Sequence, residues 1–567
     1  MSMPARPPHP GRGGAGRILP RGREIDPHAL EDMTRLLGAR PRERRWLIEY
    51  LHLVQDEYRQ ISAAHLAALA DLLRLSFAEV YEVATFYAHF DVVKEEDARI
   101  PPVTVRVCDG IACAIAGAES LAAELSQSVG GNVRVVHAPC IGQCDCAPAA
   151  LVQTRVVGHA TAARVREALA SGDHRARAIC RVDYDAYRGD GGYRLFEALR
   201  SGAASHEDLL AALDAAGHRG LGGAGFPAGR KWRAVRDMPA PRAMIVNADE
   251  GEPGTFKDRF HLESDPHRCL EGALIAAWFI EADVIHFYLR DEYAGLRQSL
   301  ADEIARLPAD WPRIELRRGA GAYICGEESA LIESLEGKRG LPRQRPPLPF
   351  QAGLFGRPTL TNNVETLHWV RDIFERGPDW WTAQGRHGRV GLRSFSVSGR
   401  VREPGVKLAP AGITLRELVD EYCGGMAEGH VLRAYLPGGT SGGLLPARLA
   451  DAPLDFGTLD HYGCFIGSAA IVVFSQADDL KGVVRNLMHF FADESCGQCT
   501  PCRLGTRKAL QLMDAGDWDR ALLGDLGAVM RDASICGLGQ AAPNPVDCLM
   551  RYFPEEFSQG AFAESQP

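Results

Sequence analysis

Several cysteines of this chain are regularly spaced, and thiols in such groups can bind metal. Four residues separate Cys108 from Cys113, and three separate Cys140 from Cys144. Each pair follows a predicted strand, so four thiolates can converge from two neighbouring loops. A [2Fe–2S] cluster requires four thiolates, whereas zinc sites favour tighter spacing on both arms. We predict a [2Fe–2S] cluster; zinc or plain buried thiols are the alternatives, and Cys146 is interpreted as a spare thiol.

A denser group of cysteines lies near the C-terminus. Cys496, Cys499 and Cys502 follow one another at intervals of three residues, a spacing typical of ligands on one face of a [4Fe–4S] cluster. Cys536 is the best candidate for the fourth ligand. Cys548 is the second candidate, but it falls in a predicted helix, where a buried thiol is the simpler interpretation. The remaining cysteines are interpreted as core residues: Cys180, Cys269, Cys325, Cys423 and Cys464.

Glycine-rich and acidic segments in the middle of the chain are suited to a nucleotide. Residues 220–225 match G-x-G-x-x-G, and glycine lets the backbone approach a phosphate or a flat ring closely. Lys231 adds a positive charge. Three further segments supply polar side chains: 247–254, 319–328 and 361–366. For the acidic pair at 327–328, a solvated helix start is the alternative interpretation.

Periodicity predicts the elements that must position these groups. Residues 25–90 are helical, with a capping box at Ser76 and Glu79. Strands and helices alternate over 103–170 and again, in a larger α/β unit, over 195–388. A strand-rich stretch follows, and residues 480–553 are helical again.

The chain is thus predicted to be an α/β multidomain protein. The expected domains are a flexible tail at 1–27, a helical segment at 28–100, a thioredoxin-like [2Fe–2S] domain at 101–175, a linker at 176–194, an FMN/NADH domain of Rossmann-like fold at 195–390, a β-grasp-like domain at 391–475 and a helical [4Fe–4S] domain at 476–567.

Composition excludes several classes of function. The formal charge is −9 over 567 residues, which disfavours binding to nucleic acid. No apolar run is long enough to span a membrane. The N-terminal residues are rich in Pro, Gly and Arg and contain no apolar signal segment, so we expect a cytoplasmic protein whose thiols remain reduced.

Taken together, these motifs resemble a known family. Residues 218–540 resemble the flavin-bearing, NADH-oxidising 51 kDa subunit of respiratory complex I, and residues 28–170 resemble its thioredoxin-like 24 kDa neighbour. The motifs at 218–232, 247–258, 322–328, 362–366 and 494–503 come in the family's order. A fusion of both subunits looks most like the β subunit of molybdenum- or tungsten-dependent NAD⁺ formate dehydrogenases. The diaphorase subunit of NAD-reducing hydrogenases is also similar.

The resemblance implies cofactors and site residues. The cofactors are FMN, NAD, a [2Fe–2S] cluster and a [4Fe–4S] cluster. The residues implied for FMN are Gly220, Gly222, Gly223, Lys231, Asn247, Asp249, Glu250, Tyr323, Glu327, Asn362, Asn363 and Thr366. Those implied for NAD are Phe226, Glu252 and Glu328, and the two carboxylates favour NAD over NADP because they repel a 2′-phosphate. Hydride transfer needs no general base, so no catalytic side chain is nominated.

The sequence departs from the family at four positions that bear on NAD docking. Leu221 stands where Arg is frequent, Ala234 and Leu348 stand where relatives carry aromatic residues, and Arg345 replaces Lys. Ferredoxin-like [4Fe–4S] motif pairs, found at the C-terminus of some hydrogenase-linked relatives, do not follow, which disfavours those branches.

The expected function is electron transfer between NAD and a partner subunit through FMN, with reduction of NAD⁺ as the physiological direction. Nothing here resembles a molybdopterin site, so formate oxidation would require the large molybdenum- or tungsten-containing α subunit. A hydrogenase diaphorase and a fused NADH-input component of complex I are the alternatives.

Overall fold

The computed structural model describes residues 24–93, 99–516 and 518–557. The chain divides into two compact units, one comprising residues up to 86 together with 90–99, and the other comprising 87–89 and the rest from 100 onward. Most of the predicted tail at 1–27, and the end of the predicted C-terminal domain from 558, lie outside the described residues. No helix in the described part is both long and apolar enough to cross a bilayer.

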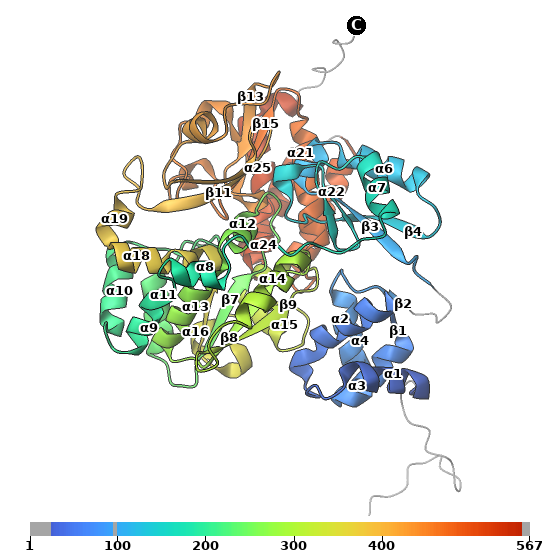
Figure 1. The fold of residues 1–567 in the computed structure, drawn as a ribbon. Coiled ribbons are helices and arrows are strands. Elements are labelled where there is room, and N and C mark those ends of the chain that lie inside the picture. Colours follow the sequence, from blue (N-terminus) through green and yellow to red (C-terminus); the bar gives the residue numbers. More distant parts are fainter. Residues whose placement is uncertain (1–23, 94–98, 517, 558–567) are drawn as a thin grey trace, which may run out of the picture. The chain divides into compact units, whose positions relative to one another are not determined.

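The first unit is helical, as predicted. It contains α1 (Pro27–Leu37), α2 (Leu47–Tyr58), α3 (Ala63–Leu73) and α4 (Phe77–Phe86), with a short parallel pair formed by β1 (Ile61–Ser62) and β2 (Val92–Val93) (Figure 1). The predicted capping box starts α4: the Glu79 N–H donates to the Ser76 hydroxyl at 3.3 Å, and the Ser76 N–H donates to the Glu79 carboxylate at 2.9 Å.

The second unit begins with a four-stranded mixed sheet in the order β4-β3-β5-β6. Its strands are β3 (Val103–Cys108), β4 (Val133–Ala138), β5 (Ala150–Val152) and β6 (Arg155–Val157). The helices α5 (Ile111–Ile115), α6 (Ala118–Ser128) and α7 (Ala162–Ala170) accompany this sheet. This is the predicted thioredoxin-like fold. The segment predicted as a linker contains a short helix, α8 (Tyr184–Gly189), capped by Asp183.

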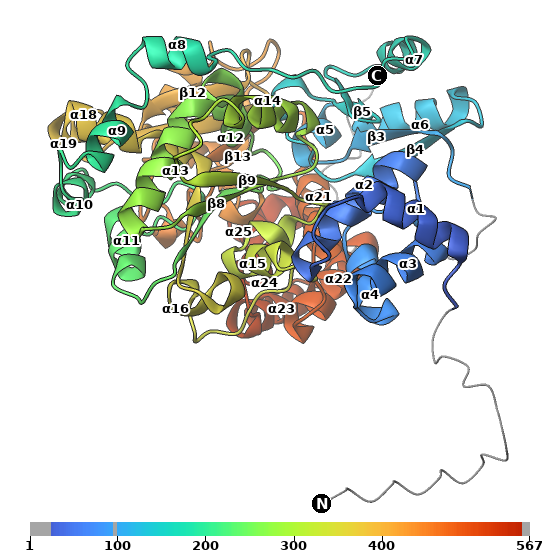
Figure 2. The same cartoon turned by 60° about the horizontal axis from the view of Figure 1, so that its bottom comes forward.

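A parallel sheet in the order β10-β7-β8-β9 forms the centre of the Rossmann-like part. Its strands are β7 (Ala243–Ala248), β8 (Val284–Leu289), β9 (Arg313–Arg318) and β10 (Thr359–Asn363). The strands are apolar almost throughout because helices cover them, among them α11 (Ala228–Arg236), α13 (Pro266–Ile280) and α14 (Ala294–Ile304) (Figure 2).

The predicted β-grasp-like part is a five-stranded mixed sheet in the order β12-β11-β15-β13-β14. Its strands are β11 (Leu392–Gly399), β12 (Gly405–Pro410), β13 (Leu432–Leu436), β14 (Leu445–Pro446) and β15 (Ala470–Ser475). The first and last strands pair in parallel at its centre.

The chain then forms five helices that pack on one another. They are α21 (Leu480–Asp493), α22 (Thr500–Asp514), α23 (Arg520–Ala533), α24 (Gly537–Ala541) and α25 (Asn544–Tyr552) (Figures 1 and 2).

Candidate flavin and iron–sulfur sites

The order of the parallel sheet determines where a ligand crevice forms. The chain runs from β7 outward through β8 and β9 and then returns to place β10 on the other side of β7, so the strand order reverses between β7 and β10. In open α/β sheets, ligands bind at the carboxyl ends of strands at such a reversal. Asn247 and Asn363 pair there in register, each as one of the last residues of its strand.

A cavity of about 630 Å³ opens at this point. Its volume lies within the range of small-molecule and cofactor pockets. Nine of the predicted site residues line it: Gly222, Gly223, Asn247, Asp249, Glu250, Glu252, Tyr323, Glu327 and Asn363. The cavity therefore gathers residues from separate motifs of the sequence.

The glycine loop is shaped for close approach. An added Cβ on Gly222 would lie 2.8 Å from Cβ of Asn363, and one on Gly251 would lie 3.1 Å from the ring of Tyr323. Gly223 has φ +134°, a backbone conformation that side chains disfavour. These positions leave the space that a flat ring system or a phosphate would occupy.

Asp249 supplies independent evidence that the cavity is built for a ligand. Burial raises the pKa of its carboxyl well above the usual value, and its Oδ2 atom is buried without a hydrogen-bond partner. A buried polar atom normally has a partner. The donors of a ribityl chain or a flavin ring would supply one, so the residues present fit FMN.

Six predicted residues do not line the cavity. Gly220 closes the glycine loop, since its N–H donates to the Phe226 carbonyl at 2.8 Å. The Thr366 hydroxyl accepts from the Leu221 N–H at 2.9 Å, and the Asn362 side chain accepts from the Trp232 indole at 2.9 Å. These three residues lie behind the wall and support it.

The other three lie near the cavity but face elsewhere. The Lys231 ammonium donates to the Thr361 carbonyl at 2.7 Å and pairs with Glu328 at 3.0 Å. Phe226 is 50% exposed, and the Arg230 guanidinium stands 5.7 Å from its ring centroid. Their predicted contacts with FMN and NAD remain predictions.

Both acidic groups of the loop after β7 are held in place. The Glu250 carboxylate accepts from the backbone N–H groups of Asp258 at 2.8 Å and Arg259 at 3.1 Å, and burial raises its pKa to about 7. Glu252 accepts from the Ser441 N–H at 3.0 Å, and burial raises its pKa as well.

Glu327 has two roles. Its carboxylate caps α15 (Glu328–Leu335) by accepting from the Ser329 and Ala330 N–H groups at 3.0 and 2.8 Å. The helix-start interpretation of the acidic pair is therefore correct for this residue, which also lines the cavity. Arg345, one of the departures from the family, binds the other Glu327 oxygen at 2.6 Å.

The first cysteine group converges as predicted. β3 and β4 are parallel with Cys108 opposite Ala138, so the two loops that follow leave the same edge of the sheet. All four thiols are buried, and Sγ of Cys140 lies 3.4 Å from Sγ of Cys144. Cys108 interacts with both Cys113 and Cys140. The donor set is four thiols from two loops, which fits a [2Fe–2S] cluster.

Contacts fasten this cysteine loop to the flavin part of the same unit. Arg290 donates to the Cys140 carbonyl at 2.7 Å, and Arg259 binds both oxygens of Asp145 at 2.8 Å. Phe256, from the loop after β7, packs against Cys140 and Cys144.

The second group also converges. Cys499 immediately precedes α22, Cys502 lies in its first turn, and Cys536 immediately precedes α24. The charges of Cys496, Cys499 and Cys536 all act on Cys502, whose pKa burial raises to about 12. Burial likewise raises the pKa of Cys536 to about 11, so binding of a metal cluster must displace these protons.

Cys548, the second candidate for the fourth ligand, lies elsewhere. It is in α25, as predicted, and its Sγ is 3.5 Å from Sγ of Cys464. Among the described residues, no three His, Cys, Asp or Glu side chains surround a single-ion position.

The flavin cavity and the second cysteine group share a wall. Gly537 and Leu538, the residues directly after Cys536, line the cavity. Glu494, two residues before Cys496, accepts from the Tyr323 N–H at 2.9 Å, and burial raises its pKa to about 7.

Sequence reasoning missed part of the lining. Lys257 and Asp258 stand inside a motif that had been recognised, but neither was assigned a role. Ser441, Ser468 and the start of α24 come from distant segments, and no local signal marked them.

Comparisons with known proteins agree with this arrangement. Three family models match the chain: the Nuo51 FMN-binding domain at residues 213–372, the thioredoxin-like [2Fe–2S] ferredoxin at 33–172, and the NADH-ubiquinone oxidoreductase-F iron–sulfur binding region at 482–560. Fold and sites thus define a flavin and iron–sulfur oxidoreductase subunit with FMN, NAD, [2Fe–2S] and [4Fe–4S] as its cofactors, as predicted.

Individual relatives narrow the class. The F 2 polypeptide of the NADH-quinone oxidoreductase from Rhizobium meliloti (strain 1021) is 38% identical over 392 residues, covering 65% of this chain and 92% of that one. The mitochondrial 51 kDa subunit of NADH-ubiquinone oxidoreductase from Neurospora crassa is 39% identical over 62% of this chain and 76% of that one. The chain belongs to the family of these F-type, or 51 kDa-type, subunits.

One solved structure is similar over most of its length. In the crystal structure of an NAD⁺-reducing [NiFe]-hydrogenase in the H₂-reduced state, a chain superposes with a TM-score of 0.77 and 34% identity, over 91% of this chain and 92% of that one. The similarity therefore spans the fused [2Fe–2S] part as well as the flavin part.

Proposed function

We propose that this chain transfers electrons between NAD(H) and a partner subunit through FMN bound in the 630 Å³ cavity. The observation that carries the proposal is the shared wall: residues that directly follow Cys536 line the same cavity as the glycine loop. A flavin in the cavity would then lie next to the [4Fe–4S] thiols.

The residues of the chain bind and orient, and the cofactors supply the reactivity. When bound, FMN exchanges two electrons with a nicotinamide and single electrons with iron–sulfur clusters. Asn247, Asp249 and Asn363 would hold FMN at the carboxyl ends of the strands. Tyr323 would border the ring, and the buried walls would exclude water.

The proposed NAD contacts determine nucleotide preference. Phe226, half exposed at the rim, is proposed to stack on the dinucleotide. Glu252 and Glu328 are proposed to face it, where their charge would repel the additional phosphate of NADP.

For the partner, we propose the large α subunit of a molybdenum- or tungsten-dependent formate dehydrogenase, with NAD⁺ reduction as the physiological direction. The support is the resemblance of the fused arrangement to the β subunit of such enzymes. The second candidate is the diaphorase subunit of an NAD⁺-reducing hydrogenase, which the full-length structural similarity favours.

Purification of the native complex tests both levels. We expect bound flavin, about six irons per chain for the two clusters, and reduction of an artificial one-electron acceptor by NADH. A co-purifying large subunit with molybdenum or tungsten supports the formate dehydrogenase assignment, whereas nickel supports the hydrogenase. Iron without flavin, in a protein inert to NADH, would refute the electron-transfer function itself.

A further inference from the structure

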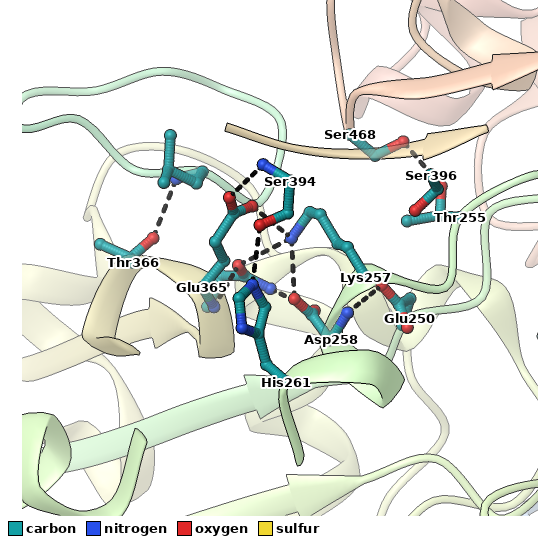
Figure 3. A network of polar contacts seen from close by, with 12 residues as sticks. Glu250, Thr255, Lys257, Asp258, His261, Glu365, Thr366, Ser394, Ser396 and Ser468 are labelled. Atoms are coloured by element: carbon teal, nitrogen blue, oxygen red, sulfur yellow. Dashed lines mark hydrogen bonds and ion pairs between the residues drawn. The ribbon is translucent and has the colours of Figure 1, made fainter. Parts of the chain in front are cut away.

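Lys257 is a buried cation in the cavity wall to which the proposed function gives no role. It is 1% exposed, and its ammonium lies 2.7 Å from Asp258 and 3.1 Å from Glu365 (Figure 3). Burial alone would lower the pKa of Lys257, but the carboxylates of Asp258 and Glu365 outweigh it and raise the pKa, so the ammonium stays charged.

The same ammonium contacts the Asn363 side chain. Lys257 Nζ donates to Oδ1 of Asn363 at 3.2 Å, and the Asn363 Nδ2 group donates to the other oxygen of Asp258 at 2.5 Å. An Asn amide presents an acceptor on one side and donors on the other. A cation on the oxygen side and a carboxylate on the nitrogen side therefore fix its orientation.

This orientation determines what Asn363 can offer to a ligand. Its oxygen is occupied, because the Glu365 N–H also donates to it at 3.1 Å. One of the two Nδ2 hydrogens is used by Asp258. The second remains for the cavity that Asn363 lines. A flipped amide would instead place its oxygen against Asp258 and its N–H groups against the ammonium.

We propose that Lys257 and Asp258 are positioning residues that hold the Asn363 amide so that it presents an N–H donor to the phosphate or ribityl oxygens of FMN. The inference rests on the proposed function, because it assumes that Asn363 contacts FMN. Neither positioning residue needs to touch the cofactor itself.

A double-mutant cycle separates positioning from a purely structural ion pair. The full chain with its clusters is stripped of FMN and titrated with FMN while flavin fluorescence is followed. Lys257→Met should raise the dissociation constant about tenfold, or about 1.4 kcal/mol. Asn363→Ala should raise it at least as much, and the double variant should match Asn363→Ala. Lys338→Met, which removes an ion-paired lysine outside the cavity, is the matched control and should bind FMN normally.

Three outcomes contradict the reasoning. If Lys257→Met leaves FMN affinity unchanged, or if its effect multiplies with that of Asn363→Ala, Lys257 does not act through Asn363. If Asn363→Ala alone leaves affinity unchanged, the proposed FMN contact is wrong as well. Should Lys257→Met fail to fold, Asp258→Asn replaces it in the cycle, because it keeps the shape of the side chain and alters only its preference for a donor.

Discussion

A methyl group added at Gly222 should weaken FMN binding without disturbing the rest of the chain. The new Cβ in Gly222→Ala would lie 2.8 Å from Cβ of Asn363 and 3.3 Å from its Cγ. Asn363 cannot turn away freely, because Lys257 and Asp258 both bind its amide. Gly222 is not among the residues with positive φ, so alanine fits its backbone conformation and the effect arises from crowding alone.

Overpacking of this kind costs about 1–3 kcal/mol, which corresponds to a dissociation constant about 5- to 150-fold higher. Titration of FMN-free protein by fluorescence measures it. Gly131→Ala is the matched control, because no atom lies within 4 Å of its added Cβ. Gly222→Ala protein that binds FMN as tightly as the wild type would refute the placement of the cofactor against this loop.

Three further predictions concern the nucleotide and the clusters. Glu252→Gln should lower the ratio of NADH to NADPH activity, because a neutral amide no longer repels the 2′-phosphate; an unchanged ratio in steady-state assays would place this carboxylate away from the ribose. Cys144→Ala should abolish the EPR signal of the [2Fe–2S] cluster, whereas Cys146→Ala should retain it; the reverse pattern would exchange their roles. Cys536→Ala should abolish the [4Fe–4S] signal, while Cys548→Ala should leave it intact because this thiol faces Cys464; loss of the signal in Cys548→Ala alone would make it the ligand.

The features predictable from sequence were those encoded by local spacing. The x2 intervals between Cys496, Cys499 and Cys502 fix which thiols share one turn of chain, and the glycine loop at 220–225 carries its own backbone requirement. Strand periodicity also indicated the α/β unit, whose parallel sheet reverses beside β7 and brings Asn247 and Asn363 together.

The features that could not be predicted depend on contacts between distant segments. Ser441 holds Glu252 across 189 positions of sequence, and nothing near either residue signals the pair. Gly220 and Thr366 belong to the correct motifs, yet the fold uses them to close and support the loop rather than to line the cavity. Motifs identify which segments meet, whereas packing determines which side chains within them face the ligand.

The central claim is that one cavity places a nicotinamide and a flavin next to the cluster on Cys496, Cys499, Cys502 and Cys536. Anaerobic titration with NADH tests it most directly, with flavin absorbance and cluster EPR followed together in wild-type and Cys499→Ala protein. We expect wild-type protein to show reduction of both centres, and Cys499→Ala to lose the [4Fe–4S] signal while NADH still bleaches the flavin. Loss of flavin bleaching in Cys499→Ala with an intact cluster signal would contradict the claim.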